Sequence, residues 1–247
     1  MTQKTALITG GLGGIGTAIC QGMQRAGYRV ATTYIHNGER LERWQQRQKE
    51  EGYDKFHPYL CNVSNWDDCV ALKDKIKGDL GDVDVLVNNA GITRDGLCRK
   101  MTPEMWDEVI TTNLSSVFYM SRQFVEDMST RGFGRIINIS SVNAQKGQFG
   151  QVNYSAAKAG IHGFTKALAQ EVVTKGVTVN TISPGYIGTD MVMAVAEEVR
   201  EKIRAQIPVG RFGTPEEIAH IVAFLAAEES GFITGSNISA NGGQHMF

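Results

Sequence analysis

Short apolar runs rich in valine and isoleucine alternate along the chain with longer segments whose apolar positions recur every three to four residues. The first pattern predicts buried strands, and the second predicts amphipathic helices. The strands are expected at residues 4–9, 29–35, 55–60, 83–88, 134–140, 177–182 and 236–240. The helices are expected at residues 14–26, 39–51, 65–79, 103–129, 152–174 and 214–228. This alternation predicts an α/β fold, a doubly wound parallel sheet of about seven strands with helices on both faces.

No repeat, low-complexity stretch or linker interrupts this alternation, so we expect residues 1–247 to form a single domain. Residues 186–210 are patterned less clearly and are rich in Met, Val and Glu. We expect them to form a mobile flap over a substrate site. The chain has no apolar run of membrane-spanning length and no signal-peptide pattern at its start, so we expect a cytoplasmic protein.

Composition narrows the possible functions. The 25 Lys and Arg residues nearly balance the 26 Asp and Glu residues, which argues against a nucleic-acid or anionic-membrane binder. Glycine is abundant, with 28 residues against only 5 prolines, which indicates many tight turns in a folded, enzyme-like chain. The cysteines and histidines lack metal-ligand spacing, so no metal site is expected. We expect buried thiols at Cys20, Cys61, Cys69 and Cys98.

A glycine-rich turn joins the first expected strand to the first helix. The strand ends in Thr9-Gly10-Gly11-Leu12-Gly13-Gly14-Ile15-Gly16, and an apolar helix follows. Such a turn brings backbone N–H groups and the positive end of the helix dipole close to a pyrophosphate. The pattern therefore predicts a dinucleotide site, although a merely tight turn between strand and helix would also use glycine.

A second motif predicts acid–base chemistry. Tyr154 and Lys158 are four residues apart in an expected helix, so both side chains project from one face, and Ser141 lies 13 positions before the tyrosine. The lysine is expected to lower the pKa of the phenol, which is ordinarily about 10. Tyr154 would then protonate a carbonyl oxygen to which Ser141 donates a hydrogen bond.

Together these motifs resemble the short-chain dehydrogenase/reductase family. The glycine turn reads T-G-x-x-x-G-x-G, and Asn88-Asn89-Ala90-Gly91, Asn113, Ser141, Tyr154, Lys158 and Pro184-Gly185 follow in the family's order, so that the resemblance covers the whole chain. It implies a single-domain Rossmann-like fold, an oxidoreductase that uses a nicotinamide cofactor, and a homotetramer. The residues that it implies for catalysis are Asn113, Ser141, Tyr154 and Lys158.

The resemblance also implies the roles of individual positions. Asn113 would hold a water that passes protons to Lys158, although a helix-bending or capping amide is the alternative. Lys158 would bind the nicotinamide ribose, and Ile187 and Thr189 would hold the carboxamide. The cofactor-binding set is Gly10, Leu12, Gly13, Gly14, Ile15, Gly16, Arg40, Asn62, Val63, Asn89, Ala90, Gly91, Ile92, Tyr154, Lys158, Pro184, Gly185, Ile187 and Thr189.

The second expected strand favours NADP(H) over NAD(H). It ends Thr33-Tyr34-Ile35-His36 without the acid that would hold a ribose 2′-hydroxyl, and Arg40 follows within the next turn. An arginine forms charge-assisted hydrogen bonds to a 2′-phosphate. The alternative is that Arg40 is an ordinary surface charge. The glycine turn departs from the pattern of NADP-using relatives, which often carry a basic residue where this chain has Leu12 and Gly13.

A closer resemblance concerns the substrate. The segments SSVNAQKGQFGQVNYSAAKAG, NNAGITRD and SPGYIGTDMV resemble NADPH-dependent reductases of 3-oxoacyl-CoA thioesters that supply polyhydroxybutyrate synthesis. The resemblance implies an acyl-CoA substrate. The substrate-binding set is Asp95, Ser141, Gln148, Phe149, Gly150, Gln151, Tyr154, Gly185 and Tyr186, with simple loop packing as the alternative for Phe149. The alternative functions are reduction of a 3-oxoacyl thioester carried by an acyl carrier protein and a non-catalytic NADP-binding sensor.

Overall fold

The computed structural model describes residues 3–35 and 38–246. Within them, seven strands form one sheet in the order β3-β2-β1-β4-β5-β6-β7, and every neighbouring pair is parallel. The strands are β1 (Thr5–Ile8), β2 (Arg29–Tyr34), β3 (Phe56–Leu60), β4 (Val85–Asn88), β5 (Gly134–Ile139), β6 (Val177–Pro184) and β7 (Asn237–Ala240). The predicted doubly wound parallel sheet is confirmed.

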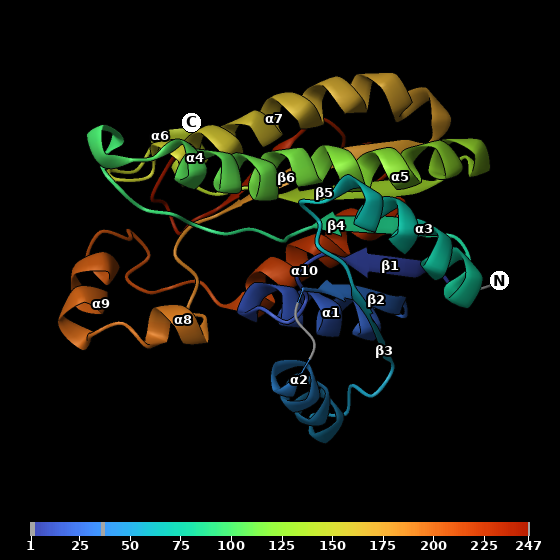
Figure 1. Ribbon diagram of the computed structural model, residues 1–247, viewed down its shortest axis with the longest axis horizontal. Coiled ribbons are helices and arrows are strands. Elements are labelled where there is room, and N and C mark those ends of the chain that lie inside the picture. Colours follow the sequence, from blue (N-terminus) through green and yellow to red (C-terminus); the bar gives the residue numbers. More distant parts are fainter. Residues whose placement is uncertain (1–2, 36–37, 247) are drawn as a thin grey trace.

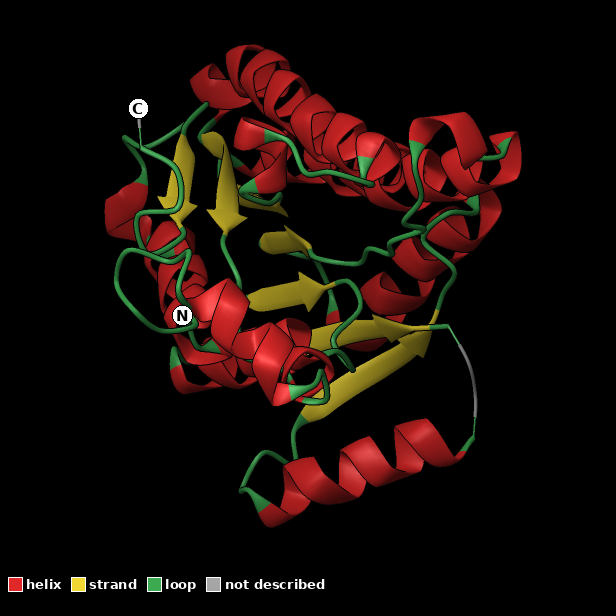
Figure 2. Ribbon diagram, turned by 90° about the vertical axis from the view of Figure 1, so that its left-hand side faces the viewer, coloured by secondary structure: helices red, strands yellow, loops and turns green. Residues whose placement is uncertain are grey.

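Helices cover both faces of the sheet (Figures 1 and 2). The α-helices are α1 (Gly14–Arg25), α2 (Glu39–Glu50), α3 (Trp66–Leu80), α4 (Pro103–Ile110), α5 (Ser116–Arg131), α6 (Asn143–Lys146), α7 (Val152–Val172), α8 (Asp190–Met193), α9 (Glu197–Arg204) and α10 (Pro215–Ala226). Helices α4, α5 and α7 lie on one side of the sheet in Figure 1, and α1 and α10 lie on the other.

The apolar runs form strands because both of their faces are buried. Along β4, Leu86 packs into the core beneath α3 and α5, whereas its neighbours Val85 and Val87 pack into the core beneath α1 and α10. Ile136 and Ile137 of β5 divide between the two cores in the same way. Successive side chains of a strand point to opposite faces, so a continuous apolar run fits a sheet covered on both sides.

Some features of the structure differ from the sequence-based prediction, and the short helix α6 is one of them. The expected helix at residues 103–129 is α4 and α5 joined by a π-helical stretch, Thr111–Ser115. The segment 186–210 contains two short helices, α8 and α9. Cys20, Cys61 and Cys69 are buried as expected, but Cys98 is exposed because it lies in a short surface helix, Cys98–Lys100.

The strand order reverses direction at β1, which lies between β2 and β4. In an open parallel sheet, this reversal leaves a crevice at the carboxyl ends of the strands, where ligands bind. None of the described helices is long and apolar enough to cross a membrane. In the same described ranges, no group of three or more His, Cys, Asp or Glu side chains is placed to hold a metal ion.

Candidate active site

The glycine turn after β1 is compact because its backbone atoms touch. Gly10 has a φ of +68°, which favours glycine, and a Cβ on Gly16 would lie 2.4 Å from the carbonyl oxygen of Gly10. Helix α1 begins directly after the turn, with no side-chain cap and no acidic residue in its first turn. Its positive end is therefore open toward the crevice, as an anion site requires.

Gly13 differs from the other glycines of this turn. Its φ of −85° suits any residue, and a Cβ there would meet the protein only at an ordinary 3.6 Å, from Gly10 O. The protein itself does not need glycine at this position. A glycine that the fold does not require, beside an uncapped helix end, fits a site where a ligand approaches the backbone closely.

Thr9, the first residue of the glycine motif, holds the turn against the end of β4. The sequence alone assigns no function to this residue. Thr9 Oγ1 accepts hydrogen bonds from the N–H groups of Asn89 and Ala90, at 2.9 and 3.0 Å. Asn89 Nδ2 donates to Thr9 O at 2.9 Å. The segment Asn89 to Ile92 is thereby placed beside the glycine turn, as its assignment to the cofactor set requires.

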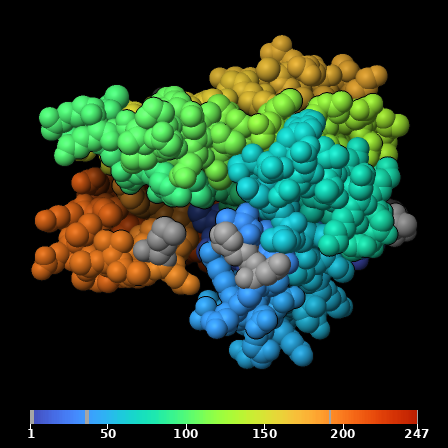
Figure 3. Space-filling model, viewed as in Figure 1, coloured from blue at the N-terminus to red at the C-terminus, as the bar shows by residue number. Residues whose placement is uncertain are grey.

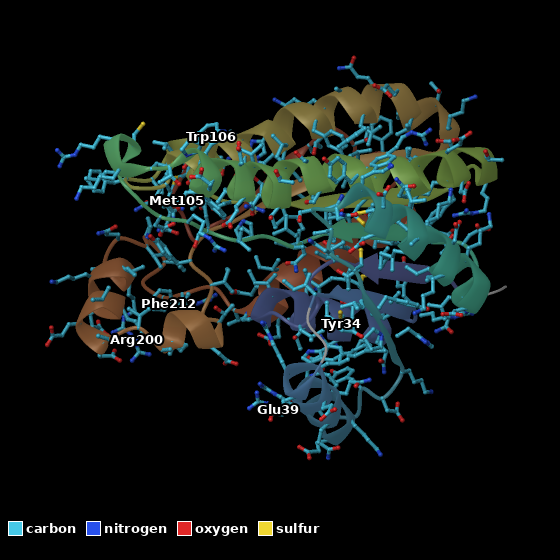
Figure 4. The ribbon with its side chains drawn as sticks, viewed as in Figure 1. Tyr34, Glu39, Met105, Trp106, Arg200 and Phe212 are labelled. Carbon is cyan, nitrogen blue, oxygen red and sulfur yellow. The ribbon has the colours of Figure 1, made fainter. Side chains whose placement is uncertain are left out.

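Arg40 is the second residue of α2 and is exposed. In the part of the chain that the structure describes, its side chain makes no hydrogen bond or ion pair, and Glu39 beside it lies 3.8 Å from Arg43. The arginine is therefore available to an anionic ligand. Figure 4 shows Tyr34, at the end of β2, and Glu39 on neighbouring elements. His36, the last residue of the Thr33-Tyr34-Ile35-His36 segment, lies outside the described residues.

Asn62 and Val63 follow β3 at the same edge of the sheet. Asn62 Oδ1 accepts hydrogen bonds from the N–H and hydroxyl of Ser64, at 3.1 and 2.7 Å. Val63 is buried. The side chain of Asn62 thus closes a local turn, and the pair offers a ligand mainly its backbone and the remaining amide group of the asparagine.

Tyr154, Lys158 and Ser141 come together beside the carboxyl end of β5. Lys158 Nζ lies 5.7 Å from the centre of the Tyr154 ring and donates to Ile139 O at 2.8 Å. Burial lowers the pKa of Lys158 to about 8, so the ammonium form still predominates at neutral pH. Ser141 Oγ accepts from the N–H of Asn143 at 3.1 Å, so its hydroxyl proton points to a different partner and can be donated within the site.

The net lowering of the Tyr154 pKa that was expected from Lys158 is not found. Burial raises the pKa of Tyr154 above its ordinary value, a hydrogen bond with Ser141 opposes this shift, and the charge of Asp95 adds to it. The lysine is buried, bonded to a main-chain oxygen and set against the ring, so desolvation of the phenolate dominates. Tyr154 is accordingly protonated at neutral pH, which is the state that a proton donor needs.

Asn113 lies fully buried in the π-helical stretch between α4 and α5. Its Nδ2 donates to the main-chain oxygens of Ile92 and Val109, each at 2.9 Å, and its Oδ1 accepts from the N–H of Ile92 at 3.2 Å. A Cβ on Gly91 would lie only 2.4 Å from Asn113 Oδ1. The amide therefore fixes the loop after β4, and one lone pair of Oδ1 remains unused.

Asp95 and Gln151, both assigned to the substrate, are joined directly. Gln151 Nε2 lies 3.0 Å from each carboxylate oxygen of Asp95, and Gln151 Oε1 accepts from Asn143 Nδ2 at 2.9 Å. Asn143 is a residue that the sequence did not single out. Gln148 is half-buried, and Phe149, at the tip of this loop, is 87% exposed. Among the described residues, none covers most of the Phe149 ring, which argues against simple loop packing.

The loop after β6 returns to the glycine turn. A Cβ on Gly14 would lie 2.8 Å from Thr189 Cγ2, which places the two proposed cofactor contacts side by side. Ile187 is buried and pairs with Gly213 through a short parallel bridge. Gly185 N donates to Ala240 O at 2.9 Å and Tyr186 N donates to Gln244 Oε1 at 3.2 Å, so residues near the C-terminus hold this loop.

Helices α8 and α9 lie at the end of the molecule where these residues gather (Figure 1). The space-filling view shows the surface hollowed between the green segment that contains α4 and the orange segment that contains α8 and α9 (Figure 3). Met105 lies on the α4 side of this hollow, and Arg200 and Phe212 lie on the other (Figure 4). The predicted flap is therefore near the site, and most of its residues are exposed.

Comparison with known proteins agrees with this arrangement. A family model described as "Enoyl-(Acyl carrier protein) reductase" matches residues 10–245. The acetoacetyl-CoA reductase of Cupriavidus necator is 59% identical over 246 residues, with all of both chains covered. That of Rhizobium meliloti is 58% identical, with 99% of each chain covered. The 3-oxoacyl-[acyl-carrier-protein] reductase FabG of Haemophilus influenzae is 42% identical, with all of both chains covered.

The family match covers nearly the whole chain, and the parallel sheet has the strand order and the glycine turn described above. Together they assign the chain both a fold and a general type of reaction. The chain belongs to the short-chain dehydrogenase/reductase family and is an oxidoreductase that uses a nicotinamide cofactor.

Proposed function

We propose that the protein is an acetoacetyl-CoA reductase that uses NADPH and forms (R)-3-hydroxybutanoyl-CoA for polyhydroxybutyrate synthesis. The observation that carries the proposal is the meeting of Ser141, Tyr154 and Lys158 at one point of the crevice. The substrate is supported by the relatives, because two proteins named acetoacetyl-CoA reductase are 59% and 58% identical, whereas the carrier-protein reductase is 42% identical.

Tyr154 and Ser141 would act on the carbonyl oxygen of the substrate. When bound, the nicotinamide supplies a hydride to the carbonyl carbon. The phenol of Tyr154 donates its proton to the oxygen, and its raised pKa keeps that proton in place at neutral pH. The hydroxyl of Ser141, whose oxygen already accepts from Asn143, donates a second hydrogen bond that stabilises the developing negative charge.

Lys158 would stabilise the phenolate that remains after proton transfer. Its ammonium lies 5.7 Å from the centre of the phenol ring and is held there by Ile139 O. An opposite charge at this range favours the ionised form of its neighbour. A water that returns protons to Lys158 would have to use the free lone pair of Asn113 Oδ1, because the other polar positions of that amide are bonded to the backbone.

The chain fits a dinucleotide along the carboxyl edge of the sheet. The uncapped end of α1, with glycine at residue 13 where the fold does not need it, fits the pyrophosphate. Arg40 fits the 2′-phosphate of NADPH, because its guanidinium is exposed and makes no described ion pair. Ile187 and Thr189 would hold the carboxamide, and Lys158 would bind the ribose beside it.

The acyl thioester would enter between the Asp95–Gln151 pair and the helices α8 and α9. The exposed ring of Phe149 offers an apolar contact at the entrance. Residues 186–210 would act as the flap that closes over the bound substrate. Closure of this kind excludes water from the reacting carbonyl.

The proposal includes a homotetramer located in the cytoplasm. Trp66 stacks on Phe118 at 6.1 Å while both rings remain partly exposed, and Phe232 is fully exposed before β7. The Trp66–Phe118 pair and the separate exposed ring of Phe232 support two kinds of subunit contact, one through the long helices and one near the last strand. The four described cysteines are free thiols, which is typical of proteins in a reducing compartment.

The test compares kcat/KM for acetoacetyl-CoA and for acetoacetyl-carrier protein, each with NADPH and with NADH. The ratio of these values measures discrimination directly. We expect the CoA thioester and NADPH to be preferred. A preference for the carrier protein would make the protein a fatty-acid-synthesis reductase, a preference for NADH would overturn the role of Arg40, and binding of NADPH without turnover would indicate the sensor.

A further inference from the structure

A series of four hydrogen-bonded polar side chains links the catalytic helix α7 to the strands beneath it. Ser140 Oγ donates to the main-chain oxygen of Lys158 at 2.8 Å. His162 Nε2 lies 2.9 Å from Ser140 Oγ and 3.3 Å from Ser183 Oγ, and Ser183 Oγ donates to Asn237 Oδ1 at 2.7 Å. This hydrogen-bonded series thus runs from α7 to the end of β5, then to β6 and β7.

The direction of these hydrogen bonds determines which ring nitrogen of His162 carries a proton. A carbonyl oxygen only accepts, so the proton of Ser140 lies on its bond to Lys158 O, and Ser140 Oγ must accept from the histidine. Ser183 likewise gives its proton to Asn237 Oδ1. Burial, together with the charge of Lys166, lowers the pKa of His162, so the ring is neutral at pH 7 and carries its proton on Nε2.

The serine that His162 orients is bonded to a catalytic residue. Lys158 is held at both ends by the segment 139–141, because its Nζ donates to Ile139 O at 2.8 Å and its main-chain oxygen accepts from Ser140 Oγ. Ser141 belongs to the same segment. Tyr154, Lys158 and His162 are spaced four residues apart and share one face of α7.

We propose that His162 is a positioning residue, which orients the Ser140 hydroxyl and so fixes the offset between α7, with its tyrosine and lysine, and the segment that carries Ser141. The inference rests on the proposed function, because it assumes that these three residues act together on the carbonyl. A displacement of about 1 Å between catalytic groups costs up to about 100-fold in rate.

Thr165 offers a matched control one turn further along the same helix. Its Oγ1 accepts from Asn138 Nδ2 at 2.9 Å and lies 2.8 Å from Thr181 Oγ1. The residue is buried and polar, and it ties α7 to β5 and β6 just as His162 does. It makes no hydrogen bond to the segment 139–141 or to Lys158.

The test measures kcat, the NADPH dissociation constant and the unfolding midpoint for His162→Leu, His162→Gln and Thr165→Val. We expect His162→Leu to lower kcat about 10- to 100-fold while NADPH, bound mainly by the glycine turn and Arg40, keeps its affinity. His162→Gln should restore most of kcat, because its amide Nε2 also donates. Thr165→Val should lower the unfolding midpoint and leave kcat unchanged.

Ser140→Ala is a second test with a smaller change in volume. It removes the hydrogen bond between His162 and residue 140, together with the bond to Lys158 O, and should lower kcat as His162→Leu does.

A His162→Leu variant that loses stability but keeps wild-type kcat would reduce the histidine to a structural contact and overturn the inference. So would a Thr165→Val variant that loses as much kcat. Tyr154→Phe is measured in the same assay. If it turns over normally, the proposed function fails first, whereas an inactive Tyr154→Phe beside a fully active His162→Leu overturns only the role of His162.

Discussion

At the scale of single residues, the site combines a phenol that holds its proton with an ammonium that gives its proton up easily. Both properties come from burial, which disfavours the phenolate of Tyr154 and the charged form of Lys158 alike. The residue types and their spacing were predictable from sequence. Their pKa shifts were not, because the amount of water removed from each group depends on the loops packed around it.

Replacing Tyr154 with Phe removes the proposed proton donor and keeps the ring. We expect kcat to fall at least about 100-fold, which is the lower range for loss of a general acid. Initial rates of NADPH oxidation measure the effect, with circular dichroism as the control for folding. Near wild-type turnover would exclude Tyr154 as the acid.

The pH dependence of kcat/KM should report Lys158. Because burial lowers the pKa of this lysine to about 8, its positive charge is present below that pH and is lost above it. The rate should therefore decline as the pH rises through about 8, while Tyr154, whose pKa is raised, remains protonated. In Lys158→Arg the decline should move to higher pH, because a guanidinium keeps its charge. A decline that stays in place would assign it to another group.

At the scale of elements, the alternation of strand and helix located the sheet and its main helices within a few residues. It did not locate the π-helical stretch around Asn113, because no residue type there marks an extra residue in a helical turn. It also did not reveal α8 and α9. These helices have only four and eight residues, and α9 contains just two apolar ones, Val199 and Ile203, so an apolar period cannot be followed beyond a single turn.

The glycine turn predicts opposite outcomes for two neighbouring substitutions. In Gly16→Ala the new methyl would lie 2.4 Å from a main-chain oxygen, so we expect a loss of about 1–3 kcal/mol in the free energy of unfolding. In Gly13→Ala the methyl meets only an ordinary contact at 3.6 Å, so stability should persist while NADPH affinity falls about tenfold. Thermal unfolding and fluorescence titration separate the two effects. Equal NADPH affinity in Gly13→Ala and the wild type would place the pyrophosphate elsewhere.

At the scale of the whole molecule, exposed aromatic rings lie on different parts of the surface, with Phe118 on α5 beside Trp66 and Phe232 alone between α10 and β7. In a tetramer built from two kinds of subunit contact, a single substitution should disrupt only the kind of contact in which it lies. We expect Phe118→Glu and Phe232→Glu each to give dimers, because a charge in a buried contact opposes association. Light scattering after size-exclusion chromatography measures the mass. Gln45→Glu adds the same charge on exposed α2 and should leave the tetramer intact. Tetramers in both phenylalanine variants would exclude these surfaces as contacts.

The loop that carries Tyr186 depends on Gln244, only a few residues from the end of the chain, and on Ala240 of the last strand. The C-terminus lies on the side of the active-site crevice, whereas the N-terminus lies at the opposite end of the sheet (Figure 1). Affinity tags, surface tethers and fused partner enzymes therefore belong at the N-terminus. A fusion made at the other end would pull directly on the loop that shapes the catalytic pocket.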